Sequence, residues 1–289
     1  MPDWSHSQLA HVANFRAVSQ KLPRLYRSAH LDAVDEKDIA LLLDKFQIRT
    51  LVDLRSLDEI NAATLSKPAQ LMRTAFKTNR KCGPGELASE GSHRLEIVHA
   101  PLLGNVDAFF DQVERMMPPT KRAQALALRS FSGKRYDQFL CDQISAGKQQ
   151  ILYTAMLRSA ADELAKGLRA AADRSKGAVL IHCAKGKDRT GVLSALLQHA
   201  AGEDEQTISD DYSVSESLLQ NWSDSRACLS VSSSTSGGVD WSQLRGSPPS
   251  AILETFAWIR AEYGAIDYFL EGVLGSDYGA WRADIEMNF

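Results

Sequence analysis

The sequence predicts an α/β fold with a small central, mostly parallel sheet flanked by helices, and two observations lead to this fold class. Short β-rich runs at 48–55, 95–102 and 178–182 are separated by stretches of helical composition, an alternation typical of parallel sheets covered by helices. The last run, Ala178–His182, is almost wholly apolar. Such a run is expected of a central strand that is buried on both faces.

The size and composition of the chain limit the possibilities further. Its 289 residues, 44% of them hydrophobic, suffice for one large domain, and we expect residues 1–289 to form a single domain. The formal net charge of −3 gives no global field that favours nucleic acid or an anionic membrane surface. No stretch approaches the ~20 apolar residues of a membrane helix, and residues 1–30 lack an apolar signal core. We therefore expect a cytoplasmic protein, or one that enters the nucleus by diffusion.

Local patterns predict the elements of the first third of the chain. Apolar positions between His11 and Val18 predict a short helix, and Leu25–Ser28 a short strand. Asp35–Phe46 carries acids in its first turn and apolar residues at helical spacing, which predicts an amphipathic helix directly before the β-rich run Ile48–Arg55. Residues 61–94 are rich in Lys and Arg, and we expect a basic loop insertion with room for one short helix. This insertion either guides an anionic substrate or is a solvated surface.

Further along, residues 107–173 have helical composition, with breaks expected near Pro118-Pro119, Gly133 and Gly147.

Two more helices are expected towards the end of the chain. The first runs from Thr190 to Ala201 and is closed by Gly202. The second begins near Pro248-Pro249 and ends at Gly264. Between them, residues 223–247 form a Ser- and Gly-rich stretch that predicts a flexible loop inserted into the domain.

The cysteines point away from metal and disulfide chemistry. Cys82, Cys141, Cys183 and Cys228 are far apart in the sequence, without a CxxC pair or a histidine at zinc-ligand spacing. We therefore predict neither a metal site nor a cofactor. The absence of a disulfide framework suits a reducing compartment, in which a thiol nucleophile survives.

The segment His182–Gly191, HCAKGKDRTG, carries the chemistry. A cysteine at the end of a strand, a glycine-containing loop, an arginine six positions later and a following helix form a nest for a tetrahedral dianion. Gly186 lets the loop curl where a side chain would obstruct it. The backbone N–H groups expected to bind the phosphate are those of Ala184, Lys185, Gly186, Lys187, Asp188 and Arg189.

Each side chain of this loop has an expected role. Arg189 offers a planar, charged fork that binds two phosphate oxygens at once. The positive potential of the loop favours the thiolate of Cys183, which would attack phosphorus and form a phosphocysteine that water hydrolyses. His182 is expected to orient the loop by hydrogen bonding. The hydroxyl of Thr190 either assists the departure of the sulfur or caps the helix.

Two other loop chemistries fit the sequence poorly. A Walker loop requires glycine and Ser or Thr at positions occupied here by Ile181 and Asp188. The loop of a rhodanese-type sulfurtransferase is typically shorter.

The pattern HCxxGKDRTG resembles the signature of the protein tyrosine phosphatase superfamily. More narrowly, it is similar to the tyrosine/dual-specificity phosphatase family that includes secreted mycobacterial and listerial phosphatases and fungal members. Flanking segments extend the resemblance to nearly the whole chain: Leu25–Ser28, Val52–Ser56 with Glu59, Asp211-Tyr212, Tyr263-Gly264 and Tyr268–Leu270. The resemblance implies a cysteine-phosphatase fold with a CX5R phosphate-binding loop. It also implies a phosphomonoesterase that acts on phosphotyrosine, with phosphoserine and phosphothreonine as further substrates.

The general acid is left open between several carboxylates. Many tyrosine phosphatases use the aspartate of a Trp-Pro-Asp loop, which this sequence lacks, and an acid contributes ~10²–10⁴ in rate. The resemblance implies the in-loop Asp188, whose alternative role is to brace the loop or Arg189. Asp53 and Asp107 are the reserves, although Asp53 with Arg55 is expected to support the site through a salt bridge.

The lysines of the loop bear on the substrate. Lys185 and Lys187 resemble the pattern of lipid phosphatases that accept several phosphates, which makes phosphoinositide hydrolysis the alternative function. Otherwise Lys185 is solvated and Lys187 pairs with Asp53 or Asp58. An inactive phospho-ligand binding module is a third hypothesis, disfavoured because Cys183 and Arg189 are both present. The expected partners are a phosphoprotein or a phosphoinositide, and the sequence predicts neither oligomeric state nor redox control.

Overall fold

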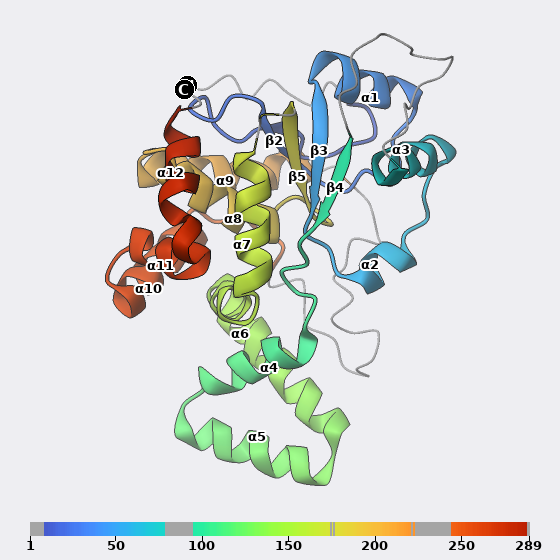
Figure 1. Cartoon of the computed structure of the whole chain (residues 1–289). Coiled ribbons are helices and arrows are strands. Elements are labelled where there is room, and N and C mark those ends of the chain that lie inside the picture. Colours follow the sequence, from blue (N-terminus) through green and yellow to red (C-terminus); the bar gives the residue numbers. More distant parts are fainter. Residues whose placement is uncertain are drawn as a thin grey trace.

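In the computed structural model, a single mixed sheet lies between two layers of helices (Figure 1). The structure describes residues 9–78, 95–173, 175, 177–220, 222 and 244–287. The strands are β1 (Arg16–Ala17), β2 (Leu25–Ser28), β3 (Ile48–Asp53), β4 (Glu96–His99) and β5 (Ala178–His182), in the spatial order β1-β2-β5-β3-β4. All pairings are parallel except that of β1 with β2. The predicted fold class is therefore confirmed.

The central strand is the one that the apolar run predicted. β5 lies between β2 and β3, and all five of its residues are buried. Its side chains alternate between the two faces: Val179 and Ile181 enter the larger hydrophobic core, and Ala178 and Leu180 the smaller one. Cys183, the residue after this strand, therefore lies at the carboxyl end of the middle strand of the sheet.

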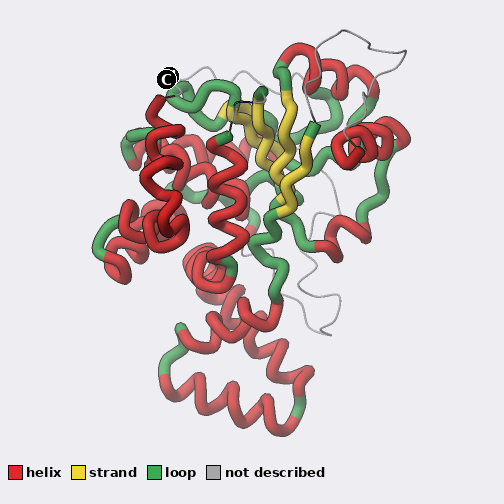
Figure 2. Tube along the Cα trace, viewed as in Figure 1, coloured by secondary structure: helices red, strands yellow, loops and turns green. Residues whose placement is uncertain are grey.

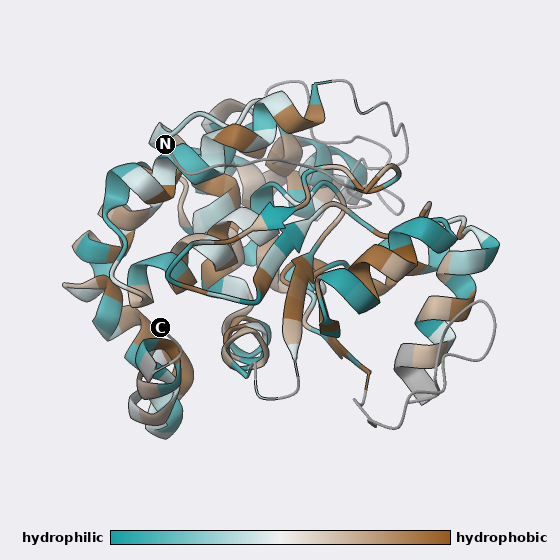
Figure 3. Cartoon of the chain, turned by 90° about the horizontal axis from the view of Figure 1, so that it is seen from above, coloured by the Kyte–Doolittle hydropathy of each residue, from teal (hydrophilic) through white to brown (hydrophobic). Residues whose placement is uncertain are grey.

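Helices surround the sheet on both sides. The helices that contribute to the larger core are α4 (Val106–Arg115), α5 (Pro119–Phe131), α6 (Gly133–Ser159), α7 (Ala161–Ala172), α8 (Asp188–Ala200), α9 (Glu205–Leu219), α10 (Ser250–Tyr263), α11 (Ile266–Leu274) and α12 (Tyr278–Met287), with the 3₁₀ turn Gly275–Asp277 between α11 and α12. On the other face lie α1 (Glu36–Ala40), the π-helical turn Leu41–Lys45 and α3 (Lys67–Thr78), and α2 (Leu57–Ala62) follows β3. Most helices show both hydrophilic and hydrophobic faces, as amphipathic packing requires (Figure 3).

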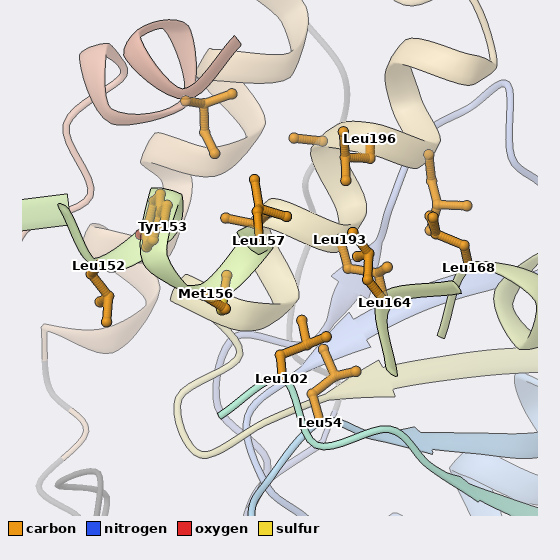
Figure 4. Packing of buried hydrophobic residues seen from close by; sticks show 14 of the residues in the cluster. Leu54, Leu102, Leu152, Tyr153, Met156, Leu157, Leu164, Leu168, Leu193 and Leu196 are labelled. Atoms are coloured by element: carbon orange, nitrogen blue, oxygen red, sulfur yellow. The ribbon is translucent and has the colours of Figure 1, made fainter. Parts of the chain in front are cut away.

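The larger core is built around the junction of α6, α7 and α8. Leu157, Leu164 and Leu193, one from each helix, lie together over Leu54 and Leu102, which follow β3 and β4 (Figure 4). This packing fixes α8 against the carboxyl edge of the sheet. It thereby holds both ends of the loop between β5 and α8.

Three helical segments project from this body as an arm. α4 (Val106–Arg115), α5 (Pro119–Phe131) and the first half of α6 extend beyond the carboxyl edge of the sheet, with α5 at the far end (Figures 1 and 2). The predicted breaks are confirmed: α5 starts at Pro119, α6 starts at Gly133, and α6 is kinked at Lys148, where φ is 50°. Within the described residues, no helix is both long and apolar enough to cross a membrane.

The expectation of a helix between His11 and Val18 is wrong. Asn14 has a φ of 58°, which interrupts a helix, and Arg16–Ala17 is the edge strand β1. The apolar residues there are buried, but not in a helix. The chain turns at Asn14, whose side chain contacts the loop between β5 and α8.

The two expected insertions are only partly described. α3 occupies residues 67–78 of the segment 61–94, so one helix is present there, as the sequence allowed. Residues 79–94 lie outside the described part of the chain, as do residues 223–243 of the expected loop at 223–247.

Candidate active site

The loop from Cys183 to Lys187 joins β5 to the first residue of α8, Asp188. Gly186 has a φ of 65°, and a Cβ atom there would lie 2.2 Å from the carbonyl oxygen of Ser28 on β2. Only glycine fits both the left-handed conformation and this close approach. The prediction that Gly186 lets the loop curl is confirmed, and β2 is the wall against which it curls.

The carbonyl groups of the loop are bound from outside. The Ala184 carbonyl accepts a hydrogen bond from the N–H of His30 (3.1 Å), and the Lys185 carbonyl accepts one from Asn14 Nδ2 (3.1 Å). The Gly186 carbonyl accepts from Asn14 Nδ2 (2.8 Å) and from the Arg27 guanidinium (3.0 Å).

These bonds determine where the N–H groups of the loop point. In a planar trans peptide the N–H lies opposite the preceding C=O. With three consecutive carbonyls turned outward, the N–H groups of Lys185, Gly186 and Lys187 are directed to the inner side of the loop. That side is the nest in which an anion binds.

A buried ion cluster holds Arg27 in place. Asp211 of α9 accepts hydrogen bonds from Arg27 Nη1 at 2.6 Å and from Arg16 Nε at 2.7 Å. All three side chains are almost fully buried. Burial, together with the neighbouring Arg27 charge, lowers the pKa of Arg16 to about 10, and Arg16 stays protonated at neutral pH.

Gly191, in the first turn of α8, allows a close approach to its neighbours. A Cβ atom on Gly191 would lie 2.8 Å from the Tyr212 ring of α9 and 3.4 Å from the Arg27 guanidinium of β2. The tightest approach is therefore between α8 and α9.

Arg189 is clamped by a carboxylate. Its Nη1 and Nη2 donate to the two oxygens of Glu59 at 2.6 and 2.7 Å, and both side chains are buried or nearly so. Glu59 also completes a capping box with Ser56 at the start of α2. Burial alone would raise the pKa of Glu59, but the charge and hydrogen bonds of Arg189 outweigh it and hold the pKa below its ordinary value. The clamp leaves Arg189 Nε buried, with no hydrogen-bond partner among the described residues.

Cys183, the predicted nucleophile, and Thr190 are both buried beside this clamp. Cys183 is a free, buried thiol at the start of the loop. Thr190 Oγ1 is also buried and, within the described part of the chain, has no hydrogen-bond partner. Thus neither of its two expected hydrogen bonds, to the sulfur or to the helix end, is formed.

His182 lies behind the loop, but its Nδ1 makes none of the expected orienting hydrogen bonds to the described residues. Its Nε2 is 3.7 Å from Asp53 Oδ2, and Asp53 is bound bidentately by Arg55 at 2.9 and 2.8 Å. Arg73 from α3 reaches the same carboxylate at 3.3 Å, so this basic residue of the segment 61–94 is an internal partner rather than a solvated one. Burial lowers the pKa of His182 to about 4 against the opposing Asp53 charge, so the ring is neutral at physiological pH.

Asp188 faces two donors. Its Oδ1 accepts hydrogen bonds from the Tyr153 hydroxyl and from Lys187 Nζ, both at 2.7 Å. Tyr153 in turn lies 2.6 Å from the Tyr212 hydroxyl. Burial and then the Asp188 charge raise the pKa of Tyr153 well above its usual value, which keeps its hydroxyl a donor. Asp188 remains half-buried, and its Oδ2 is not engaged by any hydrogen bond found for the described residues.

The two lysines have separate environments. Lys187 is buried and donates to the carbonyls of Leu244 (2.9 Å) and Gly246 (3.0 Å) as well as to Asp188. It pairs with Asp188, rather than with Asp53 or Asp58. Lys185 is half-buried, and its side chain makes no hydrogen bond or ion pair to a described residue.

The other reserve acid and a nearby cavity lie outside the loop. Asp107 is exposed in the first turn of α4. A cavity of ≈ 510 Å³ is lined by Glu59 and by residues 101–106, among others, but by none of residues 183–190.

Several residues of this site carry no signal in sequence reasoning. Asn14 and Tyr153 are single polar residues without a motif, and their roles depend on contacts across the fold. Arg27, Glu59 and Asp211 lie in the flanking segments that resemble the phosphatase family, so the resemblance identified the segments but not their function.

The mixed, mostly parallel sheet between helices, with the Cys183–Arg189 loop between the central strand and α8, is consistent with a phosphatase of the tyrosine phosphatase type. The model of the tyrosine phosphatase family matches residues 8–283, and the chain belongs to this family. The predicted family is therefore confirmed. A tyrosine-protein phosphatase from Nostoc commune is 30% identical over 109 residues, which span 35% of this chain and 36% of that protein.

Proposed function

We propose that the protein hydrolyses phosphomonoesters through a phosphocysteine intermediate, with phosphotyrosine proteins as its main substrates and phosphoserine and phosphothreonine proteins as further ones. The observation that carries this proposal is the anion nest. Three loop carbonyls are turned outward next to Cys183, and the unpartnered Nε of Arg189 is available for a phosphate oxygen. A dianion in this nest would be bound by inward N–H groups and by a permanent positive charge.

The first step transfers the phosphoryl group to sulfur. The Cys183 thiolate attacks phosphorus, an S–P bond forms, and the P–O bond to the leaving group breaks in line. Asp188 donates its proton to the leaving oxygen, which departs as an alcohol or phenol. Because Oδ1 of Asp188 already accepts two hydrogen bonds, the proton is carried on Oδ2.

The second step regenerates the enzyme. Asp188, now ionised, takes a proton from water, whose oxygen attacks phosphorus. The S–P bond breaks, inorganic phosphate leaves, and Cys183 returns to the thiolate. Arg189, held by Glu59, stays in place through both steps and stabilises the equatorial oxygens of each transition state. A reducing compartment such as the cytoplasm or nucleus suits this thiolate chemistry.

The proposal is tested by the hydrolysis of a generic aryl phosphate. Wild-type protein should turn it over, and Cys183→Ser should lose this activity while keeping its circular dichroism spectrum. If folded wild type gives no turnover but binds the phosphate compound, the protein is an inactive phospho-ligand binding module, and the enzyme proposal fails.

A second substrate class is favoured by one observation. Lys185 lies in the loop with a half-buried side chain that no described residue engages, so its ammonium group is available for a second phosphate of a phosphoinositide. Lys187 cannot serve in this way while it holds Leu244 and Gly246. Lys185→Ala should therefore reduce phosphoinositide hydrolysis and leave phosphotyrosine peptide hydrolysis nearly unchanged. An equal effect on both substrates would contradict the lipid alternative.

A further inference from the structure

The end of the arm, residues 115–136, has a charge unlike that of the rest of the chain. Residues 115–136 contain six basic residues and no acidic one, although the whole chain has a formal net charge of −3. These basic residues are Arg115, Lys121, Arg122, Arg129, Lys134 and Arg135. All six are exposed, and none forms a salt bridge with a carboxylate of the described residues.

The contacts that these cations do make leave their charge uncompensated. Arg122 donates to the Glu114 carbonyl at 3.3 Å, Lys121 to the Gln143 side chain, and Arg129 lies 5.5 Å from the centre of the Tyr136 ring. Carbonyls, amides and rings are neutral partners. Residues 115–136 at the end of the arm are therefore a local positive surface on a slightly acidic protein, whereas the remainder of α4 and α6 in the arm carries Asp107, Asp111, Glu114, Asp137 and Asp142.

The outer face of α5 is mostly apolar. Four exposed apolar residues, Ala123, Leu126, Ala127 and Phe131, share one face of the helix because they recur at intervals of three and four residues. Leu126 is 63% and Phe131 89% exposed. The opposite face contains the buried Ala125 and the half-buried Leu128, which pack into the part of the larger core that extends into the arm.

We propose that α5 is a docking surface for a lipid bilayer that contains anionic lipids. A helix with an exposed apolar face and basic flanks lies in the plane of the membrane interface, with the apolar side chains inserted and the cations on the headgroups. Leu126 and Phe131 would enter the acyl boundary. Arg122 and Arg129, seven residues apart and thus on one flank of that face, would bind phosphate or carboxylate headgroups.

Charge favours a membrane over a second copy of the chain as the occupant. A symmetric dimer through α5 would place its three basic residues, with no acidic residue on that helix, against another three, which is repulsive. An anionic bilayer instead attracts each Lys or Arg near its surface.

Docking would also turn the edge of the sheet that carries the Cys183 loop towards the lipid, at the distance set by the arm. α4 follows β4, and Cys183 follows β5, and these strands are parallel members of one sheet. The arm and the loop therefore follow strands at the same carboxyl edge of the sheet, beyond which the arm extends (Figure 1).

Membrane binding is measured without any phosphorylated substrate, so its outcome is independent of the proposed enzymatic activity.

The test is co-sedimentation of the full chain with vesicles of phosphatidylcholine alone or of phosphatidylcholine mixed with phosphatidylserine. Wild type should bind the mixed vesicles, bind the neutral ones much more weakly, and dissociate as salt is raised. Arg122→Gln/Arg129→Gln should weaken partitioning roughly ten- to thirty-fold, since each cation near such a surface contributes about fivefold. Leu126→Ser/Phe131→Ser should weaken it at least as strongly.

The matched control removes two charges elsewhere. Lys37→Gln/Lys67→Gln lies on α1 and α3, away from the arm, where both lysines are exposed (Figure 1). This variant should bind as wild type does, and all variants should hydrolyse a soluble aryl phosphate at the wild-type rate. No binding by wild type, equal binding to neutral vesicles, or an equal loss in the control would overturn the proposal. So would a wild-type dimer in sedimentation velocity that Leu126→Ser/Phe131→Ser dissociates, because the face would then bind a second copy.

Discussion

Replacing Glu59 with glutamine separates the positioning of Arg189 from its charge. The substitution keeps the shape of the side chain but removes the carboxylate that binds both terminal nitrogens of Arg189 at 2.6 and 2.7 Å. Removing one partner from a buried ion pair costs about 3–5 kcal/mol. The glutamine oxygen can still accept one bond from Arg189, so we expect a loss of about 3 kcal/mol in the free energy of unfolding.

The effect on catalysis follows from the same contact. An Arg189 that is no longer clamped swings away from the phosphate oxygens, and misplacement of this kind costs on the order of 10²-fold in kcat/KM. Urea unfolding and aryl phosphate kinetics measure the two quantities. The control is Asp58→Asn, which neutralises the exposed neighbouring carboxylate and should change the stability by less than about 0.5 kcal/mol.

The pH dependence gives an independent check. Because the pKa of Glu59 is lower in the folded protein than its ordinary 4.5, its stabilising contribution is fully present above that pH and is lost as the pH falls through the folded value. The difference in stability between wild type and Glu59→Gln should therefore shrink in acid. A variant that matches wild type in stability and in kcat/KM at neutral pH would refute the clamp.

Three further predictions follow from the loop and its supports. Gly186→Ala should abolish activity and destabilise the fold strongly, because its Cβ atom would lie 2.2 Å from a backbone atom. The control Gly264→Ala, at a φ of 88° with no atom nearer than 3.5 Å, should cost only about 1 kcal/mol in urea unfolding. Equal costs for the two variants would contradict the steric reasoning. Tyr153→Phe removes a hydrogen bond to Asp188 and should slow the hydrolysis of substrates with poor leaving groups roughly tenfold more than that of substrates with good ones. A uniform change across leaving groups would argue against a role of Tyr153 in positioning the acid. His182 has a pKa of about 4 in the folded protein against an ordinary 6.5. As the pH is lowered, the unfolded state therefore takes up the His182 proton before the folded state does. The free energy of unfolding should fall by on the order of 3 kcal/mol as the pH drops between these two values. His182→Gln should remove most of this slope, and an unchanged slope would assign it to other groups.

The parts of the fold that sequence patterns predicted are those specified by short-range periodicity. β5, the helix after the loop and the breaks at Pro119, Gly133 and Lys148 follow from local composition, because burial on both faces and turn residues leave a clear pattern. The N-terminal segment was predicted wrongly for the opposite reason. Its conformation serves long-range contacts, such as those of Asn14 with a loop more than 170 residues away.

The catalytic loop shows the same division. Cys183, Gly186 and Arg189 are recognisable from their spacing alone, since anion binding needs those residue types in that order. The groups that hold them, Glu59 and Tyr153, come from α2 and α6 and meet the loop only in the folded protein.

The loop lysines likewise needed the fold to be distinguished. Lys187 is a buried connection to Leu244 and Gly246, and Lys185 is the loop lysine that no described residue engages. The arm at 107–147 was predicted as helices, but the exposed apolar face of α5 depends on how those helices pack.

The central claim, that phosphate passes through Cys183, is tested most directly by trapping the intermediate. Wild-type protein is mixed rapidly with a phosphorus-labelled aryl phosphate, denatured in acid within one turnover, digested and analysed by mass spectrometry. We predict one labelled phosphoryl group on the wild-type peptide that contains Cys183. More of this labelled peptide should accumulate in Asp188→Asn, in which the attacking water is activated poorly. Cys183→Ser should yield no labelled peptide. Label on another residue, or undiminished turnover by Cys183→Ser, would contradict the mechanism.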